Sequence, residues 1–169
     1  GFDIKPQKHY PFEFVLQDAL TVELTPFDAV WASPPCQAYS PLRWLPRSKQ
    51  YWDSIPPTRQ AMIESGKLYV IENVMGAKLA GGWLCGRTFG LPFERHRAFE
   101  SNFFWMQPGH PKHIFGNSAL LRYCPNGKAF PVSLRDSEWH WQQWRAGMGI
   151  DWMTRAELTQ AVPPAYSRF

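Results

Sequence analysis

The chain has 169 residues and a formal net charge of +4, from 18 Lys+Arg against 14 Asp+Glu. This length fits a single domain with a substantial core, and the mild basic excess is compatible with a polyanionic partner such as nucleic acid. The three cysteines are widely spaced and form no Cys-x-x-Cys pair, which argues against a disulfide framework or a zinc ribbon. No apolar run approaches the ~20 residues that cross a bilayer, and the sequence shows no signal-peptide pattern. Composition therefore predicts a reduced, cytoplasmic protein without a membrane partner.

Short apolar segments alternate with helical patterns along the chain. Extended segments are predicted at Phe2–Ile4, Phe12–Leu16, Phe27–Ala32, Leu68–Ile71 and Ala98–Phe104. Helices are predicted at Thr58–Ser65, Ser137–Ala146 and Thr154–Ala161, and long loops at Ser40–Pro57 and Met106–Phe130. Thr58 is expected to cap the first helix and Gly66 to end it, while Thr154 and Glu157 have the spacing of a capping box. This alternation predicts an α/β domain with a mostly parallel sheet.

The strand predicted at Phe27–Ala32 stops at Pro34-Pro35, and Cys36 follows directly. Proline fixes its own φ and biases the preceding residue towards extended geometry. Two prolines in a row therefore predict a stiff elbow that holds the Cys36 thiol in place, at the end of a strand where α/β folds bind ligands. A cysteine near a turn is more often a small buried residue than a nucleophile, so the elbow alone leaves both interpretations open.

Charged side chains follow or flank other predicted strands. Glu72 and Asn73 come directly after the buried strand that ends at Ile71, and Arg95 and Arg97 alternate in a segment expected to be extended. On such a segment both guanidinium groups point to one face. Glu72 could instead be a helix N-terminal acid, and the two arginines a solvated edge. A thiol, an acid and paired cations on one rim favour a reactive cysteine, because an adjacent cation lowers the pKa of a thiol.

Three motifs carry a resemblance to a known family. They are Ser33-Pro34-Pro35-Cys36-Gln37, then Ile71-Glu72-Asn73-Val74, then Arg95-His96-Arg97. In this order and rough spacing the chain resembles the cytosine-C5 DNA methyltransferases, and Leu84-Cys85-Gly86 and Pro163-Pro164-Ala165-Tyr166 are similar to short phage-type members. The resemblance covers almost the whole chain.

The resemblance implies a Rossmann-like S-adenosylmethionine-dependent methyltransferase sheet with a short target-recognition insertion. The implied division is a catalytic core at 1–99, a recognition region at 100–145 and a C-terminal segment at 146–169 that returns to the core. Its implied partner is double-stranded DNA, with the protein acting as a monomer in the cytoplasm of a bacterial host or phage-infected cell.

The resemblance also implies catalytic roles. Cys36 would add to C6 of the target cytosine, and Glu72 would hold the N3/N4 edge and give a proton to N3. Arg97, with Arg95, would grip O2, and Asn73 is expected to brace the proline elbow rather than to touch substrate. The target atom is inaccessible inside a duplex, so the base must be flipped out.

The implied methyl donor is S-adenosylmethionine, with S-adenosylhomocysteine as product. Asp3 would bind the ribose hydroxyls, Ile4 would pack on the adenine, and Asp18 with Ala19 would meet the adenine amino group. Pro34 would line the methyl end. A role for Asp18 as a plain turn or cap residue is equally open.

The loop after Cys36 is expected to contact DNA and to close over the flipped base, with an ordinary basic surface loop as the alternative. The contact residues predicted for it are Gln37, Ser40, Arg43, Arg47 and Lys49. His110 and His113 with Cys124 do not complete a structural zinc set, so the sequence predicts no metal.

Two departures from the family pattern leave other functions open. The glycine-rich Phe-x-Gly-x-Gly loop is absent from this sequence, and Ser167-Arg168-Phe169 falls inside an expected closing helix. We expect that residues beyond both ends complete the donor pocket. The rival is a catalytically inactive DNA-binding relative that lacks a complete donor site, and a third reading gives the Pro-Pro-Cys elbow some other thiol chemistry.

Overall fold

The computed structural model describes residues 1–40, 51–113 and 138–169, with the backbone alone at 138–140. The chain divides into two compact units. Unit 1 comprises Gly1–Pro6, Val15–Leu84 and His96–Gln107, and unit 2 comprises Gln7–Phe14, Cys85–Arg95 and Pro108–Phe169. Among the described residues, no helix combines the length and apolar character needed to cross a membrane.

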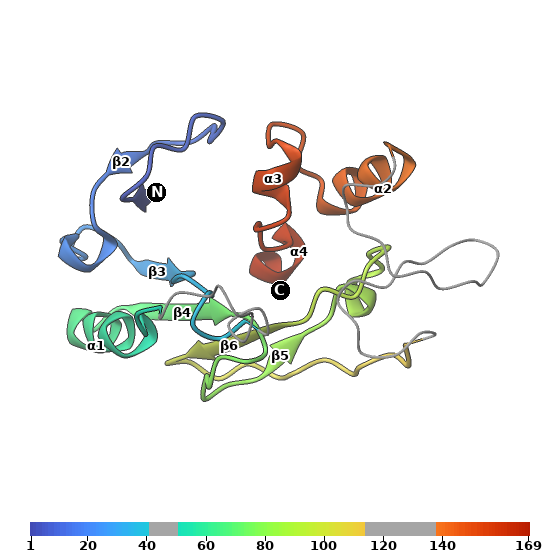
Figure 1. The fold of residues 1–169 in the computed structure, drawn as a ribbon. Helices are drawn as coiled ribbons and strands as arrows, with labels where there is room; N and C mark the ends of the chain where they lie inside the picture. The colour runs from blue at the N-terminus through green and yellow to red at the C-terminus, as the bar shows by residue number, and fades with distance from the viewer. Residues whose placement is uncertain (41–50, 114–137) are drawn as a thin grey trace. The chain divides into compact units, whose positions relative to one another are not determined.

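Unit 1 is built on a small mixed sheet. Its strands are β3 (Ala29–Ala32), β4 (Leu68–Asn73), β5 (Trp83–Leu84) and β6 (Arg97–Ser101). They lie in the order β3-β4-β6-β5, with β3 parallel to β4 and β6 antiparallel to both of its neighbours (Figure 1). A separate parallel pair is formed by β1 (Phe2–Asp3) and β2 (Val15–Leu16).

The α/β class predicted from the sequence is confirmed, whereas the mostly parallel sheet is wrong for the four-stranded part. Parallel neighbours need a crossover of a dozen or more residues, usually through a helix. Helix α1 (Ile55–Ser65) supplies that crossover between β3 and β4. The chain between β5 and β6 turns back instead, which makes this pair antiparallel.

Helix α1 begins earlier than its composition predicted. Its N-cap is Ser54, and Thr58 lies buried inside the helix with its hydroxyl donating to the Ser54 carbonyl. Pro56 and Pro57 fit in the first turn, because the N–H that proline lacks has no acceptor there. The predicted end is confirmed, since Gly66 takes the left-handed conformation at φ 64° and caps the helix.

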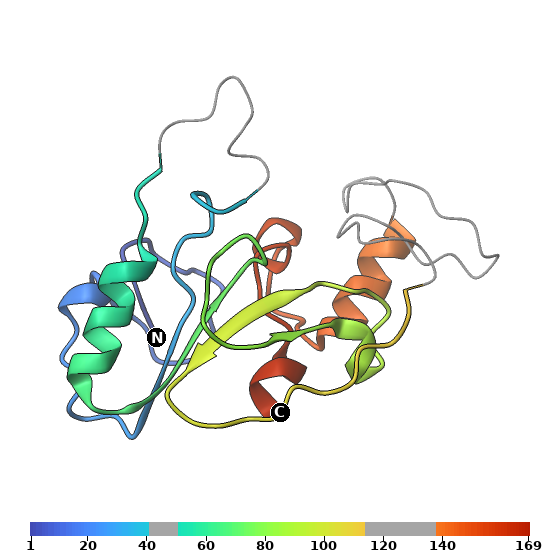
Figure 2. The ribbon, with the colours of Figure 1, turned by 90° about the horizontal axis from the view of Figure 1, so that it is seen from below.

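The core of unit 1 forms where α1 covers the β3–β4 pair (Figure 2). Met62 from the helix packs with Tyr69 and Ile71 from β4, and Ile71 is fully buried. Arg59, also from α1, binds Glu100 of the neighbouring strand β6 through two contacts of 2.6 and 2.8 Å, while the Ala80 N–H donates to the same carboxylate at 3.0 Å. The hydrogen bonds from Arg59 are the main reason that the pKa of Glu100 is lowered.

Unit 2 is mainly helical in its described part. It contains the short 3-10 helix η3 (Gly86–Phe89), α2 (Glu138–Met148), α3 (Arg155–Leu158) and α4 (Pro164–Arg168). Its core gathers Phe93, Trp144, Met148, Ile150 and Leu158. The capping box of Thr154 and Glu157 is confirmed, but α3 ends at Leu158 instead of Ala161. The predicted boundaries at 99/100 and 145/146 stay predictions, although β6 and α2 run across those two positions.

Candidate active site

The proline elbow follows β3 and presents Cys36 to solvent. Strand β3 ends at Ala32, and Cys36 is exposed after the two prolines. The Cys36 carbonyl accepts hydrogen bonds from the N–H groups of Tyr39 and Ser40, both at 3.0 Å. The thiol therefore stands at the entrance of a tight turn, where its backbone position is fixed and its sulfur is accessible.

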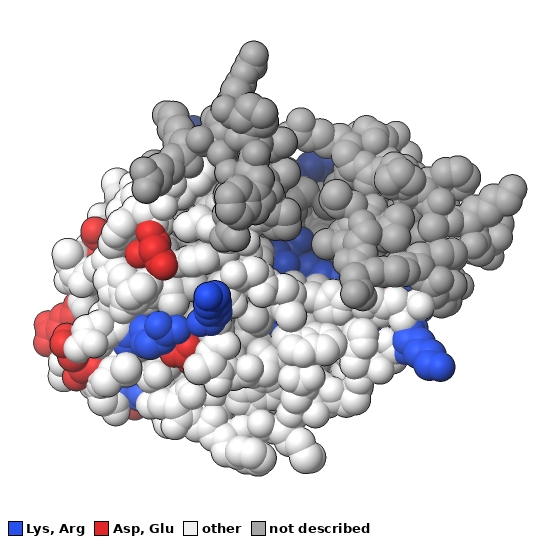
Figure 3. All heavy atoms as spheres, turned by 60° about the horizontal axis from the view of Figure 1, so that its bottom comes forward, with Lys and Arg blue, Asp and Glu red and all other residues white. Residues whose placement is uncertain are grey.

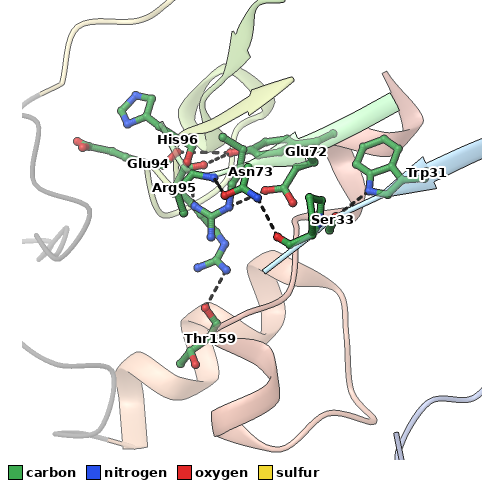
Figure 4. A network of polar contacts seen from close by, with 12 residues as sticks. Trp31, Ser33, Glu72, Asn73, Glu94, Arg95, His96 and Thr159 are labelled. Atoms are coloured by element: carbon green, nitrogen blue, oxygen red, sulfur yellow. Dashed lines mark hydrogen bonds and ion pairs between the residues drawn. The ribbon is translucent and has the colours of Figure 1, made fainter. Parts of the chain in front are cut away.

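Two buried side chains hold the carbonyls of the elbow itself. The Asn73 amide donates to the Pro34 carbonyl at 2.8 Å, and its oxygen accepts from the Val74 N–H at 2.9 Å (Figure 4). Ser54, at the start of α1, donates to the Pro35 carbonyl at 3.5 Å. Asn73 and Ser54 are only 2% and 4% exposed. The structure thus contains the expected contact between Asn73 and the elbow, and it adds Ser54, which no sequence pattern indicated.

The turn after Cys36 also makes a close backbone contact with the loop that follows β4. A Cβ added at Gly76 would lie 2.2 Å from the Tyr39 carbonyl oxygen, so only glycine allows this approach. The Tyr39 hydroxyl bonds to Asp53 and accepts from the Ile55 N–H at 3.2 Å. Burial, followed by the hydrogen bond to Asp53, raises the pKa of Tyr39 to about 12. The turn is therefore held by the loop at Gly76 and by the residues at the start of α1.

Glu72 and Arg97 form an ion pair across neighbouring strands. Arg97 Nε lies 2.9 Å from Glu72 Oε1, and the two side chains are 15% and 6% exposed. Because β3 and β4 are parallel with Ala32 opposite Ile71, the elbow after β3 begins at the same end of the sheet where β4 carries Glu72. Unit 1 therefore brings an exposed thiol, a buried carboxylate and a guanidinium to one rim of its sheet.

Arg95 does not share this arrangement. The prediction that Arg95 and Arg97 alternate on one extended segment is wrong, because β6 begins at Arg97 and Arg95 has a φ of +30°. Arg95 belongs to unit 2, where its guanidinium donates to the Thr159 carbonyl at 2.8 Å (Figure 4). The same guanidinium lies 5.3 Å from the centroid of the Trp144 ring. Its carbonyl accepts from the Tyr166 hydroxyl at 2.6 Å. These contacts make Arg95 a brace for the C-terminal part of unit 2.

The residues predicted for the methyl donor follow the parallel pair β1–β2 in unit 1. The Asp3 carboxylate accepts from the Lys5 N–H at 2.9 Å, and Ile4 is 67% exposed. Asp18 caps the short 3-10 helix η1 (Ala19–Thr21) by accepting from the Leu20 N–H at 3.0 Å. Asp18 therefore has the turn role that the sequence left open, and its carboxylate and Ala19 remain exposed.

The expected DNA contacts lie mostly outside the described residues. This applies to Arg43, Arg47 and Lys49, whereas Gln37 is exposed and Ser40 is half-buried on the turn after Cys36. On the face drawn in Figure 3, the described Lys and Arg side chains stand in separate small groups, some beside acidic side chains.

Comparisons with protein-family models, with curated proteins and with solved structures gave no match for this chain. A functional assignment therefore depends on the chemistry of the residues at the rim of the unit 1 sheet.

Proposed function

We propose that this chain carries the catalytic residues of an S-adenosylmethionine-dependent DNA cytosine-C5 methyltransferase on a Rossmann-like sheet. The proposal depends on one observation above all. An exposed cysteine on a doubly braced proline elbow follows β3, and the parallel neighbour β4 carries a buried Glu72 that is paired with Arg97. It is supported by the three sequence motifs, because they contribute Cys36, Glu72 and Arg97 to this part of unit 1.

The chemistry begins with the thiol. Cytosine C5 is a poor nucleophile, and addition of the Cys36 thiolate to C6 converts the ring into an enamine. Glu72 gives a proton to N3, which offsets the negative charge that the addition creates, and proton transfer of this kind contributes about 10²–10⁴ in rate. Arg97, which contacts Glu72 before substrate binds, then turns its guanidinium to O2 of the base.

The methyl transfer then follows from the enamine. S-adenosylmethionine supplies, when bound, a methyl group on a sulfonium that C5 can attack. The C5 proton leaves to a solvent base, Cys36 is expelled from C6 as the ring double bond re-forms, and the N3 proton returns to Glu72. The residues available for the donor fit its chemistry, because Asp3 and Asp18 offer carboxylate acceptors and Ile4 offers an exposed apolar surface.

Two assays on the same preparations test the proposal in separate steps. Duplex DNA of mixed sequence with tritium at cytosine C5 reports addition of the thiol, since the enamine exchanges its C5 hydrogen with water even without a donor. Labelled S-adenosylmethionine reports methyl transfer to the DNA. The wild-type chain is expected to give both signals, and Cys36→Ser is expected to give neither.

Cys124→Ser is the matched control and should keep both signals. Tritium release without methyl transfer would show that the chain adds its thiol to cytosine but does not transfer a methyl group. This result would favour the alternative in which the chain lacks a complete donor site. Equal signals from the wild-type chain and from Cys36→Ser would overturn the assignment of the nucleophile.

A further inference from the structure

Unit 2 brings Cys85 together with two histidines from a later segment of the chain. Cys85 is 1% exposed, and its Sγ lies 3.3 Å from Nε2 of His113. The rings of His110 and His113 lie 4.5 Å apart between their centroids. One potential ligand atom from each of these three residues lies within 4.8 Å of the others. Thiolate sulfur and imidazole nitrogen are the ligand atoms that zinc prefers.

The spacing agrees with a tetrahedral metal site. With Zn–S near 2.3 Å and Zn–N near 2.0 Å, a sulfur and a nitrogen on one zinc ion lie roughly 3.5 Å apart. The 3.3 Å between Cys85 and His113 is close to such an edge. His110 offers a third ligand atom within 4.8 Å of the other two.

Groups that would orient the ligands are also present in unit 2. Glu94 Oε2 lies 3.0 Å from Nδ1 of His113, which directs the opposite ring nitrogen towards Cys85. A carboxylate on the outer nitrogen of a histidine is a common support for a metal ligand.

A catalytic cysteine–histidine pair is the main alternative for these side chains. Such a pair needs a nucleophile that substrate can reach. Cys85 is only 1% exposed, and a second histidine lies in the same group of potential ligands. These features favour a metal ligand over a nucleophile.

We propose that Cys85, His110 and His113 bind a zinc ion that ties η3 to the segment at 108–113 within unit 2. The sequence expected no metal because it grouped the two histidines with Cys124; the proposal replaces that cysteine with Cys85. The proposal does not depend on methyl transfer, since metal binding is measured without DNA or donor.

The test uses the full chain, stripped of metal and titrated with Co²⁺ and then with Zn²⁺. Wild type and Cys124→Ser are expected to bind one equivalent, with a sulfur-to-cobalt charge-transfer band that Zn²⁺ abolishes. Cys85→Ser should lose that band. Glu94→Gln should keep it and weaken metal affinity by about 10–100-fold, because the carboxylate only orients His113.

Two results would overturn the site. One is a charge-transfer band that survives in Cys85→Ser, and the other is a wild-type chain that binds no metal after reduction. If Cys85→Ser fails to fold, the folded His113→Ala and Cys124→Ser variants decide the question. Loss of the band in Cys124→Ser with retention in His113→Ala would assign the sulfur to the other cysteine and contradict the proposal.

Discussion

Cys36 in unit 1 and Cys85 in unit 2 are the same residue type in opposite surroundings. Cys36 is exposed on an elbow whose carbonyls, rather than its sulfur, are held by buried side chains. Cys85 is buried, with its sulfur close to His113 and burial raising the pKa of its thiol. The difference teaches that the groups around the sulfur, more than the cysteine itself, separate a nucleophile from a metal ligand.

The largest expected effect compares two buried carboxylates of unit 1. Glu72 and Glu100 each face an arginine, but only Glu72 lies at the rim that carries Cys36. Glu72→Gln is expected to lower the single-turnover rate of methyl transfer by about 10²–10⁴, because N3 loses its proton donor. Glu100→Gln should keep the rate of the folded fraction and lower the melting temperature, since Arg59 loses its charged partner. An unchanged rate in Glu72→Gln would return this residue to a structural role.

A direct comparison of the two cysteines comes from thiol alkylation in the Cys124→Ser background. Cys36 is expected to react about 100-fold faster than Cys85 in the folded chain, because a buried thiol reacts only after local opening. Mass spectrometry of digested protein gives both rates in one experiment. Equal rates in the native chain would contradict the contrast between the exposed and the buried cysteine.

A smaller effect is expected when the side chain that braces the proline elbow is removed. Asn73→Ala removes the hydrogen bonds to the Pro34 carbonyl and from the Val74 N–H. We expect a loss of about 1–3 kcal/mol in unfolding free energy, and a rate lowered by about tenfold or more because the thiol is displaced.

Asn102 offers the matched control for Asn73. It makes the same two kinds of bond at the other end of β4, accepting from the Tyr69 N–H at 2.9 Å and donating to the Lys67 carbonyl at 2.7 Å. Asn102→Ala should lower stability and leave the rate of the folded protein unchanged. If both variants lose activity equally, the elbow has no special positioning role.

The smallest expected effect is the contribution of the His9–Glu157 ion pair of unit 2 to the stability of the fold. Hydrogen bonds from His9 and then from Thr154 lower the pKa of Glu157 from 4.5 to about 2. A lowered carboxyl pKa stabilises the fold above its ordinary value, and this contribution is lost as pH falls from about 4.5 to about 2. The melting-temperature difference between wild type and Glu157→Gln should shrink over that window. Because the pair is partly exposed, the contribution is expected to stay below about 1 kcal/mol. A difference that is constant with pH would contradict the lowered pKa.

The sequence predicted the elements of the fold better than their directions. Apolar runs placed β3 and β4 closely, and Gly66 and Thr154 marked a helix end and a helix start as expected. The antiparallel direction of β6 could not be predicted, because apolar spacing is the same for either direction. Pro56 and Pro57 were assigned to a loop, although proline is also suited to the first turn of a helix.

The candidate sites show the same limit. Cys36 and Glu72 were found because each comes after an apolar run. The predicted strand end at Ile71 is wrong, because β4 continues to Asn73 and includes Glu72. Arg95 was misplaced because its partners, Thr159 and Tyr166, lie far along the chain and hold it out of the strand. The group around Cys85 could not be found from spacing, since its ligands come from two distant segments that only the folded chain brings together.

The most direct test of the central claim, that Cys36 is the nucleophile, is to map a covalent adduct. The chain is incubated with S-adenosylmethionine and a duplex of mixed sequence in which every cytosine is 5-fluorocytosine. Fluorine at C5 cannot leave as a cation, so the enzyme cannot be released after methyl transfer. The account predicts a nucleotide-bearing peptide that contains Cys36 and is absent from Cys36→Ser. An adduct on Cys85 or Cys124, or no adduct from a chain that methylates ordinary DNA, would contradict it.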